Sequence, residues 1–158
     1  MRKYFRIILA GFVVVLLSAL FACGSPAGTT TSTTPLPTGP QSKDLVNGDI
    51  SVAAEIRNNY AFNVTADMKD VSVVGSFKTI GGVPNTIEAY LMDDATYVNW
   101  IKGRTVHILF DSGSLSSGNI DQAITVPGLY HIVFANYYPA SVAPEQLVTT
   151  NIQLKWNY

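Results

Sequence analysis

The pattern of apolar and polar positions changes twice along this chain of 158 residues. A continuous apolar run covers residues 7–21, small and polar residues follow it, and from Asp44 onward apolar residues mostly alternate with polar ones. Alternation with a period of two is typical of β-strands with one buried face. The sequence therefore predicts a β domain over residues 44–158, preceded by two segments of different character.

Eight strands are expected in this domain, separated by turn-forming residues. The first two would form a hairpin through Asn58 and Asn59, since asparagine tolerates the left-handed backbone of tight turns. Gly75 interrupts the third strand and indicates a bulge or a close approach by another element. The seventh strand has the most buried character, and the eighth alternates most regularly. The expected strands cover residues 50–56, 60–64, 71–78, 87–92, 106–110, 120–126, 129–136 and 148–157.

One short helix is expected after the fourth strand. Asp93 and Asp94 offer side-chain oxygens that can cap its first turn. The spacing of Tyr97, Trp100 and Ile101 places them on one face, which would cover an end of the fold. Eight short antiparallel strands with almost no helix predict an all-β fold, an antiparallel β-sandwich.

The apolar run at the start of the chain predicts an export signal. Arg2, Lys3 and Arg6 precede it, and a basic start followed by a short apolar run is typical of secretory signal peptides. The alternative is an uncleaved transmembrane helix, but a helix that crosses a bilayer needs ~20 apolar residues.

The end of this run, Leu20-Phe21-Ala22-Cys23, resembles the lipobox of bacterial lipoproteins. The resemblance implies that residues 1–22 are removed and that the Cys23 thiol carries a diacylglycerol. An ordinary free thiol is the alternative, although the small residues Ala22 and Gly24 suit lipoprotein processing. Two or three acyl chains hold a protein firmly on a membrane. The expected location is the bacterial cell envelope, at the outer face of the cytoplasmic membrane or at the outer membrane.

Residues 23–43 are expected to form a flexible linker behind this anchor. Sixteen of the twenty residues 24–43 are Gly, Ser, Thr or Pro, which cannot build an apolar face. Such a segment reaches about 25 Å as a flexible coil and about 60 Å as extended polyproline.

Charge and cysteine content narrow the partners. The whole chain has a net charge of −1, and loss of the signal peptide leaves seven basic against eleven acidic residues. So few scattered cations cannot neutralise a run of phosphates, so nucleic acid is not an expected partner. The single cysteine excludes an intrachain disulfide.

Three segments give the domain a family resemblance. They are IEAYLMDDATYVNWIK from Ile87, ILFDSGSLSSGNI from Ile108, and VPGLYHIVFAN from Val126. Together with the final amphipathic strand they resemble the bacterial relatives of the Golgi-dynamics (GOLD) β-sandwich. The resemblance implies a protein-interaction module rather than an enzyme. The paired cysteines of the eukaryotic members are missing, so no trafficking role follows. The pre-peptidase C-terminal domain is similar too, but its Asp-rich strand starts are missing.

The sequence gives less support to a catalytic or metal-binding function than to an interaction module. Asp111-Ser112-Gly113 is similar to the loop of retropepsin-like aspartic peptidases, which would require a homodimer to pair two carboxylates. A turn of the sandwich explains the same residues without chemistry. His107 and His131 lie on expected strands without acidic or cysteine neighbours at metal-ligand spacing, so we expect strand-face residues and neither a metal nor a cofactor.

The expected binding surface is the loop that holds Tyr137 and Tyr138. Adjacent residues of an extended chain point to opposite sides, so at least one ring is expected at the surface unless both fold over an end of the sandwich. The helix residues Tyr97 and Trp100 would extend this surface if the fold brings them close. The expected partners are a membrane, through lipidated Cys23, and another envelope protein. A purely structural envelope lipoprotein remains the third alternative, and the oligomeric state stays open.

Overall fold

The computed structural model describes residues 37–81, 83–143 and 145–158. The predicted signal peptide, the Cys23 anchor and most of the predicted linker lie outside these residues. The described part contains eight strands and one short helix. These are β1 (Gln41–Ala53), β2 (Arg57–Val64), β3 (Lys69–Thr79), β4 (Ile87–Asp93), α1 (Asp94–Trp100), β5 (Phe110–Leu115), β6 (Ser117–Ala123), β7 (Gly128–Ala135) and β8 (Glu145–Asn157).

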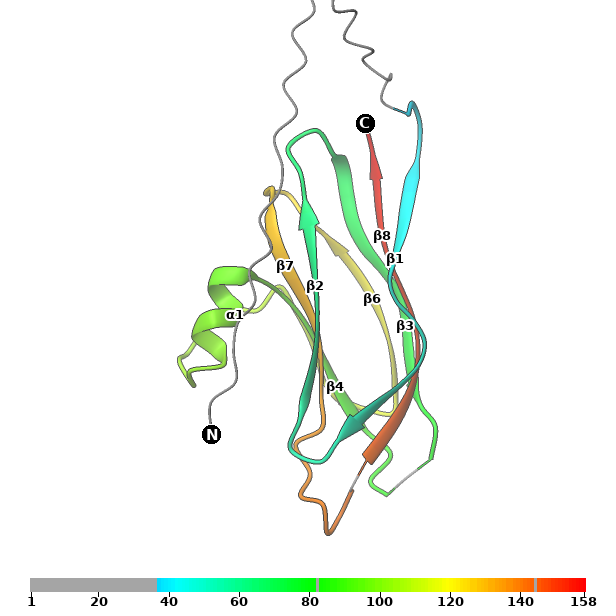
Figure 1. The fold of residues 1–158 in the computed structure, drawn as a ribbon, viewed down its shortest axis with the longest axis vertical. Helices are drawn as coiled ribbons and strands as arrows, with labels where there is room; N and C mark the ends of the chain where they lie inside the picture. The colour runs from blue at the N-terminus through cyan, green and yellow to red at the C-terminus, as the bar shows by residue number, and fades with distance from the viewer. Residues whose placement is uncertain (1–36, 82, 144) are drawn as a thin grey trace, which may run out of the picture. The chain divides into compact units, whose positions relative to one another are not determined.

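The strands form two four-stranded antiparallel sheets that face each other (Figure 1). One sheet has the order β1-β8-β3-β6 and the other has the order β2-β7-β4-β5. This is the strand order of an eight-stranded jelly roll, which closes two Greek keys into a sandwich. The predicted all-β sandwich of eight strands with one short helix is therefore confirmed.

The core lies between the two sheets and follows the alternation of the strands. Phe77 of β3 and Phe134 of β7 meet edge to face across it, with ring centroids 5.8 Å apart. Each large apolar side chain that becomes fully buried contributes about 1.5–3 kcal/mol to folding. In β8 every second residue from Gln146 to Leu154 is buried, which confirms the predicted alternation of this strand. β7 is buried continuously from Tyr130 to Ala135, as expected for a strand covered on both faces.

The predicted hairpin at Asn58 and Asn59 is wrong. The chain turns earlier, at residues 54–56, where Glu55 adopts the left-handed backbone conformation with φ of 58°. β1 and β2 then belong to different sheets. Both asparagines lie in β2, and the Asn58 side chain donates to the Ser51 carbonyl at 2.7 Å. Their amides make hydrogen bonds outside β2 instead of forming a turn.

Several strand boundaries differ from the prediction. The fifth expected strand at 106–110 is wrong, because residues 106–109 lie outside the strands, and β6 begins at Ser117 instead of Ile120. β1 begins at Gln41, nine residues before the first expected strand, because its early residues pair with the end of β8. β5 begins at Phe110 and runs through the stretch that was expected to be a turn. The cause is a bulge: Ser112 accepts a hydrogen bond from the Ala89 amide at 2.8 Å, and Gly113 has a φ of 61°. Serine and glycine here shape a strand rather than end one.

Gly75 confirms the prediction of a close approach. A Cβ atom at this position would lie 1.9 Å from the carbonyl oxygen of Asn151 on β8. The backbone φ of Gly75 is 149°, a value that residues with side chains rarely adopt. The central pairing of β3 with β8 therefore requires glycine.

The helix α1 covers the outer face of the β2-β7-β4-β5 sheet rather than an end of the sandwich (Figure 1). Asp93 caps it as predicted, because its Oδ1 accepts a hydrogen bond from the Thr96 amide at 2.7 Å. Tyr97 and Trp100 pack on the sheet, but Ile101 is 45% exposed, so the predicted shared face is only partly correct. No helix within the described ranges has the length and apolar character needed to cross a bilayer.

Candidate functional site

The outer face of the β2-β7-β4-β5 sheet carries a second, smaller apolar cluster. It consists of Tyr90, Met92, Val133 and Ala135, with Tyr97, Trp100 and Ile108 packed on it. β4 and β7 have apolar residues on both faces, so this side needs a cover, and α1 provides one. Rings from α1 therefore lie over the sheet beside strand residues that stay accessible.

The pairing of the strands determines which residues lie side by side on this face. Arg57 of β2 lies opposite Ala135 of β7, which in turn lies opposite Glu88 of β4. Directly opposed residues of antiparallel strands share a face. Neighbouring strands are about 4.8 Å apart, so Arg57 and Glu88 start about 10 Å apart on either side of a small alanine. A positively charged and a negatively charged side chain thus lie on either side of Ala135.

The Arg57 guanidinium is stacked between two aromatic rings. Its Cζ atom lies 4.9 Å from the centroid of Trp100 and 5.6 Å from that of Tyr137. Trp100 also contacts Tyr90 and Tyr97, with ring centroids 5.1 and 6.4 Å apart. We call Arg57, Tyr97, Trp100 and Tyr137 the Arg57 surface. The structure thus brings the predicted helix residues Tyr97 and Trp100 together with Tyr137.

Stacking leaves the guanidinium fork free. Each cation–π contact contributes about 0.5–1 kcal/mol at an exposed site, which restrains the orientation of the arginine plane. Within the described part of the chain, no hydrogen bond or ion pair joins the Arg57 side chain to another residue. Its N–H groups are therefore available for an acceptor from outside, and a carboxylate matches their geometry best.

The loop between β7 and β8 is positioned by one buried amide. Asn136 is 1% exposed, and its Nδ2 donates to the carbonyls of Val52 and Ala143 at 3.3 and 3.2 Å. Its Oδ1 accepts a hydrogen bond from the Tyr138 amide at 3.1 Å. Asn136 thus fixes the backbone from which both tyrosines leave. Tyr137 is 44% exposed, whereas Tyr138 is partly buried.

A small pocket lies beside Tyr137 and has a volume of about 180 Å³. Three hydroxyl groups meet in it: Ser114 Oγ donates to Thr86 Oγ1 at 2.9 Å, and Thr86 Oγ1 lies 3.1 Å from the Tyr138 hydroxyl. Ser114 Oγ lies 3.4 Å from the same tyrosine oxygen. Glu88 adds a carboxylate to the wall. We call this the hydroxyl pocket.

The two tyrosines near Glu88 differ in acidity. Hydrogen bonds from Ser114, and next from Thr86, lower the pKa of Tyr138 because they stabilise its phenolate. Burial, and next a hydrogen bond to Glu88, raises the pKa of Tyr90. The Tyr90 hydroxyl therefore stays protonated and donates to one oxygen of Glu88.

His131 is buried under α1 and links three elements. Its ring stacks on Tyr97 with centroids 4.2 Å apart, its Nδ1 lies 3.0 Å from Asn59 Oδ1, and its Nε2 lies 3.0 Å from Asp94 Oδ1. His131 lies on strand β7, as expected. Its contact with Asp94 could not be predicted from sequence spacing, because the fold brings α1 over β7. His107 lies outside the strands, contrary to expectation. Among the described residues, no group of three His, Cys, Asp or Glu side chains is placed to hold a metal.

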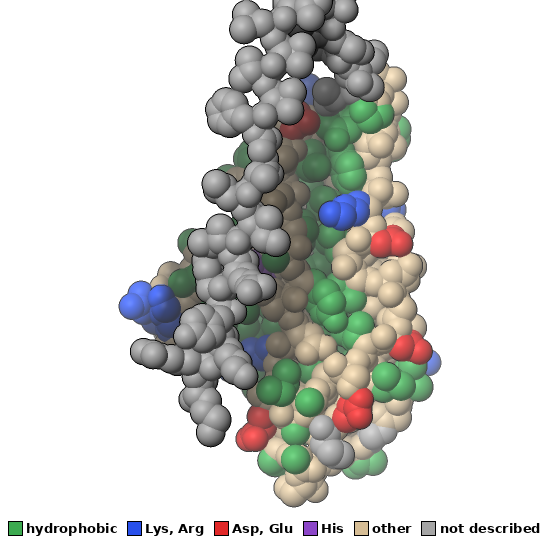
Figure 2. Space-filling view, viewed as in Figure 1, with side chains coloured by type: hydrophobic (Ala, Val, Ile, Leu, Met, Phe, Trp, Pro, Cys, Tyr) green, Lys and Arg blue, Asp and Glu red, His purple; other side chains and the backbone are tan. Residues whose placement is uncertain are grey.

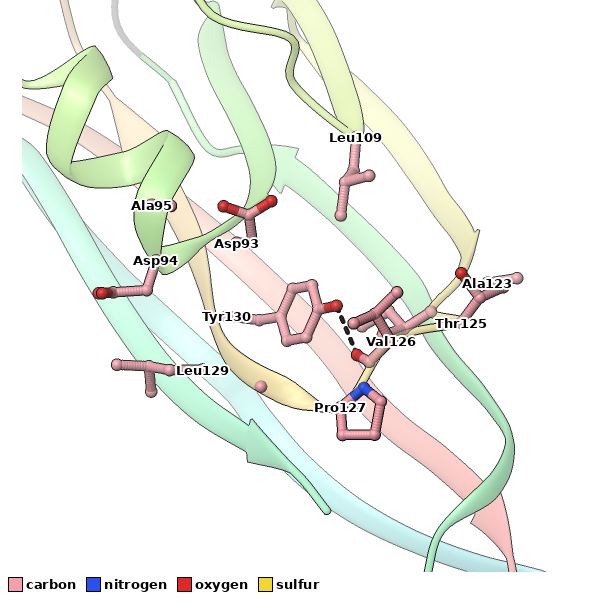
Figure 3. A pocket seen from close by; sticks show the side chains of 12 residues that line it. Asp93, Asp94, Ala95, Leu109, Ala123, Thr125, Val126, Pro127, Leu129 and Tyr130 are labelled. Carbon is pink, nitrogen blue, oxygen red and sulfur yellow. Dashed lines mark hydrogen bonds between the residues drawn. The ribbon is translucent and has the colours of Figure 1, made fainter. Parts of the chain in front are cut away.

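A larger hollow of about 530 Å³ lies between the start of α1 and the segment before β7 (Figure 3). Leu109, Val126 and Leu129 give it apolar walls, and Tyr130 closes part of it by donating to the Val126 carbonyl at 2.6 Å. Its acidic groups already have partners: Asp93 caps the helix and Asp94 contacts His131. The hollow is therefore mostly apolar, and one oxygen of each of these two carboxylates is already engaged within the fold.

Asp111 has a structural partner in its own strand. Its Oδ1 accepts a hydrogen bond from the Gly113 amide at 2.8 Å, which stabilises the bulge of β5. This contact accounts for the Asp-Ser-Gly sequence through backbone geometry.

Sequence reasoning missed Arg57, Glu88, Thr86 and Ser114. All four lie on three different strands or their ends, and only the register of β2, β7, β4 and β5 brings them together. No local motif marks such residues. Asn136 did carry a signal, because it ends VPGLYHIVFAN, one of the three segments singled out in the sequence.

The fold and these contacts define an eight-stranded antiparallel β-sandwich with an aromatic, arginine-centred surface on one outer face. The charged side chains that are visible in Figure 2 are scattered over the face. Searches against models of protein families and against curated proteins find no match to this chain.

Proposed function

We propose that this protein is a lipid-anchored module of the bacterial cell envelope that binds another envelope protein through the Arg57 surface. The observation that carries the proposal is the guanidinium of Arg57, stacked between Trp100 and Tyr137 with its fork free. Tryptophan, tyrosine and arginine are the residues most enriched at interface hot spots. The resemblance to the GOLD sandwich, an interaction module, supports the same class.

The position of the surface suits presentation away from a membrane. Gln41, where the predicted linker enters the sandwich, pairs with Trp156 at one end of the β1-β8 ladder, and Ala53 pairs with Glu145 at the other end. The loop with Tyr137 leads into Glu145, and Arg57 follows Ala53 after a short turn (Figure 1). Thirteen residues of β1 span about 40 Å. Arg57 and Tyr137 thus lie toward the end opposite Gln41, and Tyr97 and Trp100 extend the surface onto the adjoining outer face.

A tethered domain does not need a tight interface. A linker that confines both partners to one compartment raises their effective concentration and strengthens a weak contact. The free fork of Arg57 indicates that the partner contributes a carboxylate to the contact.

Removal of the Arg57 side chain should abolish most of the binding to the partner protein. Arg57→Ala is expected to reduce in-cell crosslinking to the partner at least tenfold, since removal of a hot-spot residue costs about 2 kcal/mol or more. Arg57→Lys should restore little of the signal, because lysine keeps the charge but lacks the planar fork. Crosslinking from a probe near Tyr137, followed by affinity capture, measures the effect.

Arg104→Ala is the matched control, because it removes the same charge from an exposed arginine whose partner is Asn99. It should leave the crosslink unchanged. An Arg57→Ala protein that keeps both its melting temperature and its crosslink would contradict the proposed surface.

The anchor is tested at Cys23. Cys23→Ala is expected to shift the protein from the membrane fraction to the soluble fraction or to leave an unprocessed precursor, because no acyl chain can attach. Fractionation and intact mass measurement of the exported protein check this. An unmodified cysteine in a soluble mature protein would refute the anchor without bearing on the Arg57 surface.

A further inference from the structure

The hydroxyl pocket brings several polar groups together. Thr86, Ser114 and Tyr138 bring three hydroxyls within 3.4 Å of one another, although they come from three separate segments of the chain. Glu88 accepts a hydrogen bond from Tyr90 through one carboxylate oxygen. Its other oxygen has no hydrogen-bond partner among the residues that the structure describes. A ligand that enters the pocket therefore meets an acceptor and several hydroxyls at once.

The three hydroxyls form a small hydrogen-bonded cluster. Ser114 donates to Thr86 at 2.9 Å, and Thr86 and Tyr138 share a hydrogen bond of 3.1 Å in which either can be the donor. Each hydroxyl has one proton and two lone pairs and can rotate to suit its partner, so the cluster can also bond to a ligand. The pocket thus offers hydroxyl groups at Ser114 and Tyr138 and a carboxylate acceptor at Glu88.

Aromatic area adjoins these groups. Tyr137 and Tyr138 both line the pocket, and Tyr137 is exposed. Tyrosine offers a flat apolar face at a low entropic cost. A ligand that fits has closely spaced hydroxyls around its rim and an apolar face of C–H groups, which is the chemistry of a pyranose ring.

Charge favours a neutral ligand over a cation. The carboxylate of Glu88 alone would attract an ammonium group, but Arg57 lies in the same cross-strand row, with only Ala135 between them. Opposite charges at this spacing largely cancel the local potential. The volume of about 180 Å³ suits a small ring and is below the range of drug-sized sites.

We propose that the hydroxyl pocket binds one ring of a neutral saccharide, with Glu88, Ser114 and Tyr138 as hydrogen-bonding groups and Tyr137 as the stacking face. This site is separate from the contact proposed for the partner protein, although Tyr137 borders both. A saccharide site would give the domain a second ligand in the envelope.

The full-length protein, in a detergent without a sugar headgroup, is applied to an array of neutral mono- and oligosaccharides. The best-binding sugar is then titrated by calorimetry against the wild type, Ser114→Ala and Tyr138→Phe. Each substitution removes one hydroxyl and keeps the surrounding shape, so each should weaken binding about two- to tenfold at an unchanged melting temperature. Arg104→Ala should bind the sugar as the wild type does.

Trilysine serves as the competing probe. If the pocket is a cation site, trilysine binds in place of the sugar, Ser114→Ala weakens it, and Arg57→Ala strengthens it by removing the compensating charge. That result would overturn the proposal. The absence of any bound neutral sugar on the array would also overturn it, as would sugar binding that Ser114→Ala and Tyr138→Phe leave unchanged. If Arg57→Ala loses the crosslink to the partner protein but keeps its affinity for the sugar, the two ligands bind at different sites.

Discussion

Gly75→Ala is expected to lower the free energy of unfolding by about 3 kcal/mol or more. The new Cβ would lie 1.9 Å from the Asn151 carbonyl oxygen and 2.8 Å from the Ile152 Cα, and both belong to the backbone of β8. Backbone atoms in the middle of a paired strand cannot rotate away as a side chain does, so β3 and β8 must separate. Urea unfolding followed by tryptophan fluorescence measures the change.

Gly48→Ala separates the clash from backbone strain. Gly48 has a φ of 101°, also a conformation that residues with side chains rarely adopt, but a Cβ there would meet nothing within 4 Å. This control should cost about 1 kcal/mol. Equal losses at the two positions would show that the close approach of β8 contributes nothing.

Asn136→Ala is expected to destabilise the protein by about 3 kcal/mol and to release the loop that holds Tyr137 and Tyr138. The substitution leaves the carbonyls of Val52 and Ala143 and the amide of Tyr138 without their partner in a buried setting. An unsatisfied buried polar group costs about 1–3 kcal/mol. Urea unfolding measures stability, and limited proteolysis measures the exposure of the loop.

Asn157→Ala provides the comparison, because its amide bonds to Asp70 at 3.1 Å in an exposed place. Surface substitutions of this kind change stability by less than about 0.5 kcal/mol. If Asn136→Ala unfolds like the Asn157→Ala control and its loop resists protease equally, then Asn136 does not hold the loop.

Local alternation was enough to predict which residues face the core. Val148, Ile152 and Leu154 alternate with polar residues, and the buried face of β8 follows directly. The close approach at Gly75 could also be predicted, because glycine inside a strand usually marks limited space or an unusual backbone conformation.

The alternation of apolar and polar residues did not predict which strands pair. A period of two fixes the face of a residue but says nothing of the neighbouring strand, so the two asparagines of β2 were mistaken for a hairpin turn. The actual turn uses Glu55, which has no intrinsic preference for the left-handed region. The Arg57 surface depends on this pairing, since Arg57 reaches Trp100 and Tyr137 only because β2 lies beside β7.

The placement of Gln41 and Arg57 at opposite ends of the sandwich has a mechanical consequence. If the proposed membrane anchor pulls at Gln41 and the proposed partner holds Tyr137, the force acts along β1 and β8 rather than across them (Figure 1). The hydrogen bonds of an antiparallel pair are perpendicular to the strands, so such a force shears them. The load is shared among the twelve residue pairs from Gln41–Trp156 to Ala53–Glu145, whereas peeling would break them one after another.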